Sequence, residues 1–131
     1  SSGSWCYDDK SSNCEKLGRL YDWETAKKVC HEGWHLPSKS EFETLLDNFE
    51  GEKDAYSALI PSGNSGFSAL FGGWRYYDGS FSSVGEDGSF WSSSPKDDDS
   101  AWHLGIYSYF RKAGMYGSSR SLGFSVRCLQ D

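Results

Sequence analysis

Four cysteines are the residues whose chemistry is most apparent from the sequence. Cys6 and Cys14 lie close together near the start, Cys30 ends a short amphipathic segment, and Cys128 lies three residues before the last one. Their even number, without a spacing typical of zinc sites, favours disulfides formed in an oxidising compartment. Four cysteines allow three pairings. The polar turn between Cys6 and Cys14 favours the pairing Cys6–Cys14 with Cys30–Cys128, in which the second bridge closes nearly the whole chain into one loop.

Acidic and histidine residues are the other candidates for metal chemistry. Residues 86–87 and 97–99 are acidic runs, and calcium prefers such oxygen ligands. They lack the glycine and glutamate spacing of an EF-hand, and an acidic run in a loop is typical of solvated surface. His31, His35 and His103 show no paired zinc-ligand spacing. The sequence therefore predicts no metal site and no cofactor, with a structural calcium ion as the alternative.

Catalytic signals are weak. An activated nucleophile needs a neighbouring base and an orienting group, and no Gly-x-Ser-x-Gly elbow is present. The cysteines are expected to be used in bridges. Nineteen acidic residues make some pair of carboxylates inevitable, but nothing singles one out for glycoside hydrolysis. We therefore predict that the protein is not an enzyme, and a hydrolase is the least favoured alternative.

Composition bounds the domain count and the class of partner. A chain of 131 residues suits one domain, which we place at residues 5–131 after a linker of residues 1–4. The net charge of −6 with scattered acidic residues disfavours nucleic acid, and no apolar run is long enough to span a membrane. No signal peptide is apparent, so we expect a mature protein or a fragment. Aromatic residues make up 17%, more than one small core needs, which indicates exposed rings used in recognition.

The first half of the chain has helical signals. Residues 5–7 and 19–21 suggest a short antiparallel ribbon. Asp22 is a potential N-cap for a helix over residues 23–30. A second helix is predicted from the Ser38/Glu41 capping box to Gly51, with apolar residues at helical spacing. Residues 54–60 form a short third helix or a turn.

The second half has strand and turn signals. Short strands are predicted at residues 67–70 and 73–77, followed by a hairpin turn at Asp78-Gly79. Longer ones are predicted at residues 90–94, 101–110 and 123–129, where apolar and polar residues alternate. The fold class is α+β, with two helices packed on a looped, mostly antiparallel sheet.

Six separated motifs resemble a known family. They are Gly33-Trp34-His35-Leu36-Pro37-Ser38, Gly66-Phe67-Ser68-Ala69-Leu70 with Gly72-Gly73, Phe90-Trp91-Ser92-Ser93, Ala101-Trp102 and Gly123-Phe124-Ser125-Val126-Arg127-Cys128. In this order they are similar to the Fibrobacter succinogenes major paralogous domain of secreted and surface proteins of gut bacteria. The resemblance implies a C-type-lectin-like fold, related to that of formylglycine-generating enzymes, in which the first helix is disulfide-bonded to the last strand. It implies an extracytoplasmic setting but no common ligand; related domains display ligands or form pilus tips.

In folds of that kind, loops and outward strand faces of the C-terminal half bind ligands. Tyrosine suits such a surface, because it combines a large ring with one polar group. The alternation over residues 101–110 predicts one exposed patch of His103, Tyr107, Tyr109 and Tyr116. The candidate ligand-binding residues are Tyr76, Tyr77, His103, Tyr107, Tyr109, Arg111, Met115 and Tyr116, whereas the tryptophans Trp23, Trp34, Trp74, Trp91 and Trp102 are expected mostly in the core.

The expected function is that of a recognition or display module. It would bind a protein or glycan at the cell surface through the aromatic C-terminal face. The sequence has Trp91-Ser92-Ser93 where calcium-dependent lectins have Trp-Asn-Asp, so a calcium-bridged sugar site is not expected. The alternative is a structural or assembly module, such as a pilus-tip or envelope subunit.

Overall fold

The computed structural model describes residues 3–131, and it combines short helices with small antiparallel sheets. The helices are η1 (Tyr7–Asp9), α1 (Ser11–Leu17), α2 (Trp23–Ala26), α3 (Lys39–Leu46) and α4 (Glu52–Leu59). The strands are β1 (Ser4–Trp5), β2 (Leu20–Tyr21), β3 (Trp34–His35), β4 (Trp74–Arg75), β5 (Phe81–Ser82), β6 (Asp87–Pro95), β7 (Ser100–Tyr107), β8 (Lys112–Ser119) and β9 (Leu129–Gln130). The α+β class is confirmed, but the described residues form four α-helices rather than two.

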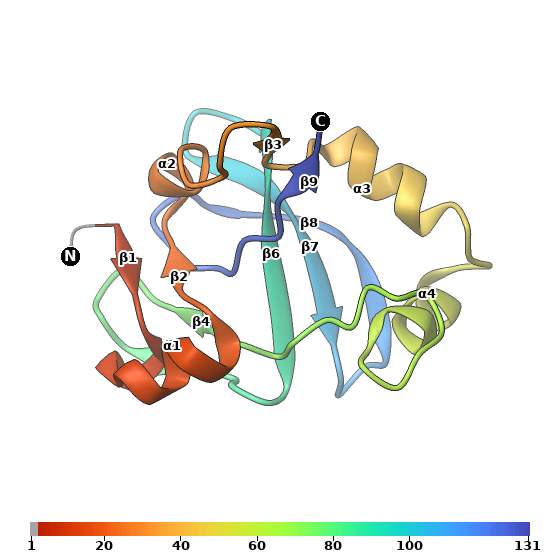
Figure 1. The fold of residues 1–131 in the computed structure, drawn as a ribbon, viewed down its shortest axis with the longest axis horizontal. Helices are drawn as coiled ribbons and strands as arrows, with labels where there is room; N and C mark the ends of the chain where they lie inside the picture. Colours follow the sequence, from red (N-terminus) through yellow and green to blue (C-terminus); the bar gives the residue numbers. More distant parts are fainter. Residues whose placement is uncertain (1–2) are drawn as a thin grey trace.

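The largest sheet has the strand order β6-β7-β8 and is antiparallel throughout. Figure 1 shows it crossing the middle of the molecule, with α3 and α4 on one side and the N-terminal elements on the other. The register places Trp91 of β6 opposite His103 of β7, and His103 opposite Tyr116 of β8. Alternation along β7 therefore gives each side of the sheet its own set of side chains.

Each side of this sheet packs against its own core cluster. Phe42 of α3 and Leu59 of α4 are buried with Leu104 and Ile106 of β7. The other cluster contains Trp23, Leu36, Trp91 and Phe124. Buried indole N–H groups need acceptors. Trp91 Nε1 donates to the Tyr21 carbonyl at 2.7 Å, and Trp23 Nε1 donates to the Ser92 carbonyl at 2.8 Å.

The five tryptophans expected in the core divide into three groups. Trp23 and Trp91 are buried, as predicted. Trp74 and Trp102 are half-buried. Trp34, at 47% exposure, is not a core residue, because β3 pairs only with the short edge strand β9 at the surface.

The helix-start signals are confirmed, whereas the helix ends were predicted too late. The Asp22 carboxylate accepts from the Thr25 backbone N–H at 2.9 Å. The predicted helix over residues 23–30 nevertheless ends at Ala26, because Lys28 N–H bonds back three residues to the Thr25 carbonyl and tightens the last turn. Cys30 is therefore outside the helix.

The capping box at the start of α3 is complete. Ser38 Oγ accepts from Glu41 N–H at 3.1 Å, and Glu41 Oε1 accepts from Ser38 N–H at 2.9 Å. The helix ends at Leu46 instead of continuing to Gly51, and Phe49 lies in the following turn. Of the segment 54–60, left open between helix and turn, residues 54–59 belong to α4, and Ile60 is its extended C-cap residue.

Replacing Ser38 with alanine is expected to lower the free energy of unfolding by about 1 kcal/mol, because α3 loses its N-cap acceptor. Urea unfolding followed by circular dichroism measures this loss. Ser57→Ala, on the exposed side of α4, is the control and should change stability by less than about 0.5 kcal/mol. Equal effects of the two substitutions would contradict a stabilising role of the cap.

Both predicted disulfides are present. The Cα atoms are 5.0 Å apart in Cys6–Cys14 and 5.8 Å apart in Cys30–Cys128. The residues between Cys6 and Cys14 form η1 and the start of α1, not the predicted polar turn. The predicted ribbon is present as the pairing of β1 with β2.

The predicted linker is shorter than expected. Ser4 is 8% exposed and pairs with Tyr21, and the Gly3 carbonyl accepts from Asp22 N–H at 3.0 Å. Both residues therefore belong to the fold, because their backbone groups are hydrogen-bonded to it. Ser1 and Ser2 lie outside the described residues.

Some predicted strands are irregular instead. Residues 67–70 form no strand, since Ala69 N–H bonds to the Leu59 carbonyl at the end of α4. Residues 123–125 make isolated bridges, and only Leu129–Gln130 at the end of the last predicted strand pairs as β9. The hairpin turn at Asp78-Gly79 is confirmed between β4 and β5. None of the helices within residues 3–131 has the length and apolarity that a membrane crossing requires.

Candidate functional site

A cavity of about 160 Å³ lies beside the β6-β7-β8 sheet, on the side that carries His103. Strands β4, β6, β7 and β8 contribute to its lining, together with the chain at residues 122–124. We call it the His103 cavity; its lining residues are Trp74, Asp87, Ser89, His103, Tyr107, Ser118, Leu122 and Phe124.

His103 is held in a buried aromatic environment. It is 2% exposed, and its ring centre lies 4.6 Å from that of Phe124 and 6.2 Å from that of Trp91. Burial disfavours the charged imidazolium and lowers the pKa of His103 to about 4. The imidazole is therefore neutral near pH 7.

The contacts of the His103 ring favour one of its two tautomers. Nε2 lies 3.2 Å from the Tyr107 hydroxyl, whereas buried Nδ1 has no hydrogen-bond partner within residues 3–131. We assign the proton to Nε2, because an unpartnered lone pair is less costly than an unpartnered buried N–H. The Tyr107 oxygen then accepts from His103, and its own O–H remains available as a donor.

Tyr107 lies folded back over β7. A side chain at Gly105 would overlap the Tyr107 hydroxyl and ring, so the glycine makes room for the tyrosine. The Tyr107 ring also packs edge-on against Tyr116, with ring centres 5.4 Å apart. Burial, with the nearby Asp87 carboxylate, raises the pKa of Tyr107 to about 12. The phenol thus keeps its proton at neutral pH.

Asp87 supplies the carboxyl group of the cavity. It lies opposite Tyr107 in the β6–β7 register, and its backbone carbonyl accepts from Gly73 N–H at 2.9 Å. Burial raises the pKa of Asp87, and the nearby Glu86 charge acts in the same direction. The cavity therefore combines one carboxyl acceptor with a phenol donor and a neutral imidazole.

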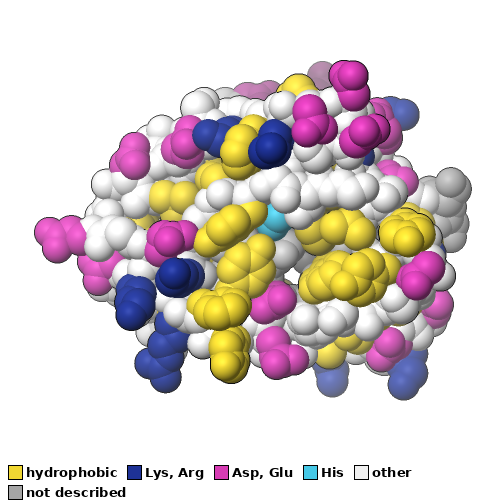
Figure 2. Space-filling model, turned by 180° about the vertical axis from the view of Figure 1, so that it is seen from behind, with side chains coloured by type: hydrophobic (Ala, Val, Ile, Leu, Met, Phe, Trp, Pro, Cys, Tyr) yellow, Lys and Arg dark blue, Asp and Glu magenta, His cyan; other side chains and the backbone are white. Residues whose placement is uncertain are grey.

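Aromatic rings of the β4–β5 hairpin lie next to the cavity. Trp74 lines it, and Tyr76 packs on Trp74 with ring centres 4.2 Å apart. Tyr76 and Tyr77 are 42% and 75% exposed. Figure 2 shows hydrophobic side chains gathered across the middle of one face of the molecule, with charged side chains around them.

The structure brings together only part of the sequence-predicted site. His103 and Tyr107 line the cavity, Tyr116 packs against both rings, and Tyr76 packs on Trp74. Met115 lies on the other side of the sheet, next to Leu104 in the register. Tyr77 is in the β4–β5 turn, and Tyr109 and Arg111 are in the turn between β7 and β8.

The expectation of one exposed patch of His103, Tyr107, Tyr109 and Tyr116 is wrong. His103 is buried, because the chain at Phe124 covers that side of β7. Tyr109 is 86% exposed but follows the end of β7, where the alternation no longer applies. Whether the predicted residues bind a ligand stays a prediction.

Sequence reasoning missed Trp74, Asp87 and Ser89 as site residues. Trp74 was assigned to the core, and Asp87 to a possible calcium loop. Their common location depends on the pairing of β6 with β7 and on the placement of β4, which no local pattern encodes. One sequence signal could have pointed to Asp87 and Ser89. Alternate residues of a strand lie on the same side of the sheet, so both residues lie on the same side of β6.

The acidic run at residues 97–99 has a local structural role. Asp97 Oδ1 accepts from the backbone N–H groups of Asp99 and Ser100 at 2.9 and 2.8 Å. Its hydrogen bonds, that with Ser100 foremost, lower the pKa of Asp97. Between Gly3 and Asp131, no three His, Cys, Asp or Glu side chains are arranged to hold a metal ion.

The helices, antiparallel sheets and two disulfides define a disulfide-bonded α+β domain. The model of the Fibrobacter succinogenes major domain family matches residues 1–130, so the chain belongs to this family. No curated protein and no solved structure matches the chain.

Proposed function

We propose that the domain is a non-enzymatic recognition module of a secreted or cell-surface bacterial protein, and that it binds a protein or glycan ligand through the aromatic surface of its C-terminal half. The observation that carries this proposal is the His103 cavity. It offers the Tyr107 hydroxyl, whose other neighbours are His103 and Ser89, and the Asp87 carboxyl group beside exposed rings. Large rings with few polar groups are typical of ligand sites.

The volume of the cavity indicates the size of the chemical group that it can bind. Whole small-molecule ligands occupy pockets of roughly 300–1,000 Å³. A cavity of about 160 Å³ instead suits a single group of a larger ligand, such as a sugar hydroxyl edge or an amide side chain. The rest of that ligand would then lie on the exposed rings of Tyr76 and Tyr77.

The protonation states favour binding over proton transfer. General acid–base catalysis is most effective when the pKa of the catalytic group lies near the working pH. The pKa values of about 4 for His103 and about 12 for Tyr107 lie far from neutrality. The pair thus acts as a fixed set of neutral hydrogen-bonding groups.

Two further aspects of the proposal rest on the disulfides. Both bridges favour an oxidising, extracytoplasmic compartment. Cys30–Cys128 joins the N-terminal half to the C-terminal segment, which agrees with the C-type-lectin-like arrangement that we propose for this fold.

Tyr107→Phe tests the proposed site. A glycan array and a peptide-display library would identify the ligand, and calorimetry would give its Kd. The substitution is expected to weaken binding up to about tenfold, because the ligand loses one neutral hydrogen bond. Tyr109→Phe, in the exposed turn, is the matched control and should leave the Kd unchanged. A folded Tyr107→Phe protein with the wild-type Kd would exclude the cavity.

An assembly role is the second candidate, and the turn between β7 and β8 favours it. Tyr109 and Phe110 are 86% and 62% exposed, and their rings contact each other edge-on at 5.0 Å. Such exposed aromatic pairs are typical of protein contacts. If this role is correct, Tyr109→Ala with Phe110→Ala would block assembly of the parent protein while ligand binding by the isolated domain persists.

A further inference from the structure

Strand β8 is the last strand in the order β6-β7-β8, so one of its edges faces away from the sheet. The hydrogen bonds of β6 show which residues form that edge. The carbonyls of Asp87 and Ser89 accept from Gly73 and Ser125, away from β7. Because partners alternate along antiparallel ladders, Ala113, Met115 and Gly117 of β8 turn their backbone groups outward.

The two outer edges of this sheet differ. The edge of β6 is covered by bonds to residues 73, 125 and 37. In the described part of the chain, no backbone hydrogen bond reaches Ala113, Met115 or Gly117 from outside the sheet. Met115 is half-buried and Gly117 is exposed. An unpaired edge of this kind is a template for a further strand.

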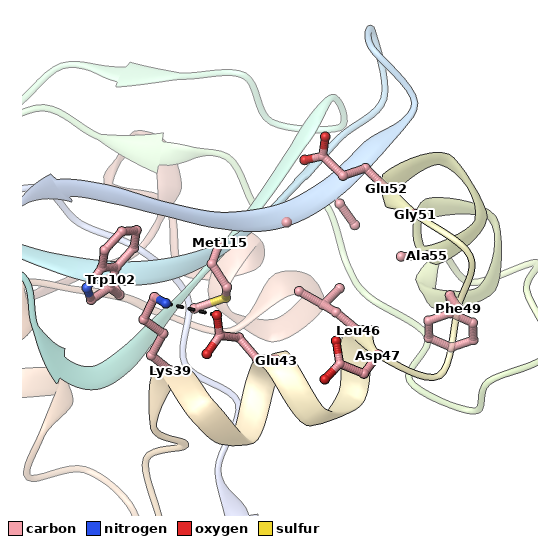
Figure 3. A pocket seen from close by; sticks show the side chains of 12 residues that line it. Lys39, Glu43, Leu46, Asp47, Phe49, Gly51, Glu52, Ala55, Trp102 and Met115 are labelled. Atoms are coloured by element: carbon pink, nitrogen blue, oxygen red, sulfur yellow. Dashed lines mark hydrogen bonds and ion pairs between the residues drawn. The ribbon is translucent and has the colours of Figure 1, made fainter.

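A groove of about 660 Å³ runs beside this edge, between β8 and the helices α3 and α4. Figure 3 shows Trp102 and Lys39 at one end, Glu52 at the other, and Met115 between them. Leu46, Ala55 and Ala113 add apolar lining. The lining residues of this groove differ from those of the His103 cavity. Tyr116 lies between the two sites, since its ring packs on His103 and Tyr107 and its hydroxyl binds Glu52.

The charges of the groove are mostly negative. Glu43, Asp47 and Glu52 line it, and Lys39 is the cation among the lining residues. The Lys39 ammonium lies 2.9 Å from a Glu43 oxygen and 4.6 Å from the centre of the Trp102 ring. The Tyr116 hydroxyl fixes Glu52 by donating to Oε1 at 2.7 Å. In the part of the chain that the structure describes, Asp47 and Glu52 form no ion pair with a Lys, Arg or His side chain.

We propose that the outer edge of β8 receives an extended segment of another protein, which adds a strand to the sheet. Its backbone pairs with Met115 and Gly117, and its alternate side chains, apolar and Lys or Arg, enter the groove. Strand addition takes its affinity from main-chain bonds and its specificity from such alternate side chains. A second copy of this chain fits less well, because pairing two β8 edges would bring the two sets of carboxylates together.

Amide hydrogen exchange measured by NMR tests the proposal on the wild-type protein. In the free protein, the amides of Met115 and Gly117 should exchange faster than those of Gly114 and Tyr116, which point toward β7. The probe, called the Lys/Val peptide, is the capped sequence Thr-Lys-Thr-Val-Thr-Lys-Thr-Val, in which Lys and Val share one face of the strand and Thr occupies the other; the Glu/Val peptide has Glu in place of each Lys. The Lys/Val peptide should slow exchange at Met115 and Gly117 at least tenfold, and the Glu/Val peptide should bind at least tenfold more weakly.

Met115→Pro supplies the matched variant. Proline removes the outward N–H without taking a bond from the β7 ladder, a position where edge strands tolerate it. It should abolish binding of the Lys/Val peptide, whereas Met115→Leu should retain it. Equal binding by the proline variant, or by the Glu/Val peptide, would overturn the proposal.

If the proline variant does not fold, the wild-type exchange decides. Unchanged exchange at Met115 and Gly117 in millimolar Lys/Val peptide would overturn strand addition. Tyr107→Phe should not alter binding of the Lys/Val peptide. If the peptide does not bind to β8, the proposed function of the His103 cavity is unaffected. If the cavity does not bind a ligand, the proposal of strand addition is likewise unaffected.

Discussion

Replacing Cys30 and Cys128 with serine is expected to remove about 4–5 kcal/mol from the free energy of unfolding. The bridge joins residues 98 positions apart, and closing a loop of about 100 residues contributes about 4.7 kcal/mol in the chain-entropy treatment. A domain of this size typically has about 5–15 kcal/mol in total. The double variant should therefore be marginally folded at 37 °C.

The second disulfide provides the internal comparison. Cys6 and Cys14 are 8 positions apart, and the same treatment gives about 2.5 kcal/mol for so short a loop. Urea unfolding of the two double-serine variants and of the oxidised wild type measures both losses. A larger loss for the Cys6/Cys14 variant would show that loop length does not determine the stabilisation.

Acidification from pH 6.5 to pH 4 is expected to destabilise the protein through His103 by about 3 kcal/mol. In the unfolded chain the imidazole takes up a proton near pH 6.5, but burial lowers its pKa in the folded protein to about 4. Each pKa unit corresponds to about 1.4 kcal/mol. Stability is thus fully retained above pH 6.5 and is lost as the pH falls toward 4.

The comparison of wild type with His103→Gln isolates this effect. The variant lacks the titrating group, so its unfolding free energy should fall less over the same range, whatever its packing loss at all pH values. Urea unfolding at several pH values gives both curves. Parallel curves would mean that His103 titrates alike in the folded and unfolded states.

The pKa of His35 is shifted in the direction opposite to that of His103. Hydrogen bonds to Asp131 (Nδ1, 2.7 Å) and Glu41 (Nε2, 2.9 Å) raise its pKa. Its contribution is present below pH 6.5 and is lost as the pH rises through the folded pKa. His35→Gln should therefore change the pH dependence in the direction opposite to His103→Gln.

Local signals predicted the elements that depend on short-range chemistry. The Ser38/Glu41 capping box marks the start of α3, and the alternation of β6 and β7 marks those strands. Strand β8 escaped prediction, because its glycines and serines weaken both strand propensity and alternation. The end of α2 was also predicted too late, because Lys28 N–H bonds to the Thr25 carbonyl and tightens the last turn.

The site was predicted in part for the same reason. Alternation along β7 placed His103 and Tyr107 on one side of the strand, and both line the cavity. Alternation does not tell what covers that side. Phe124 packs on His103 and buries it, and the β4–β5 hairpin contributes Trp74 to the cavity. These are tertiary contacts, so the alternation along one strand does not predict them.

The most direct test of the proposed recognition site is an NMR titration of isotope-labelled domain with neutral and charged small molecules. Monosaccharides and primary amides represent the neutral group, and acetate and methylammonium represent the charged one. We expect neutral compounds to shift the His103 imidazole and Trp74 indole resonances, and Tyr107→Phe to abolish these shifts. If no neutral compound at millimolar concentration shifts them, or if the shifts persist in Tyr107→Phe, the His103 cavity is not the recognition site.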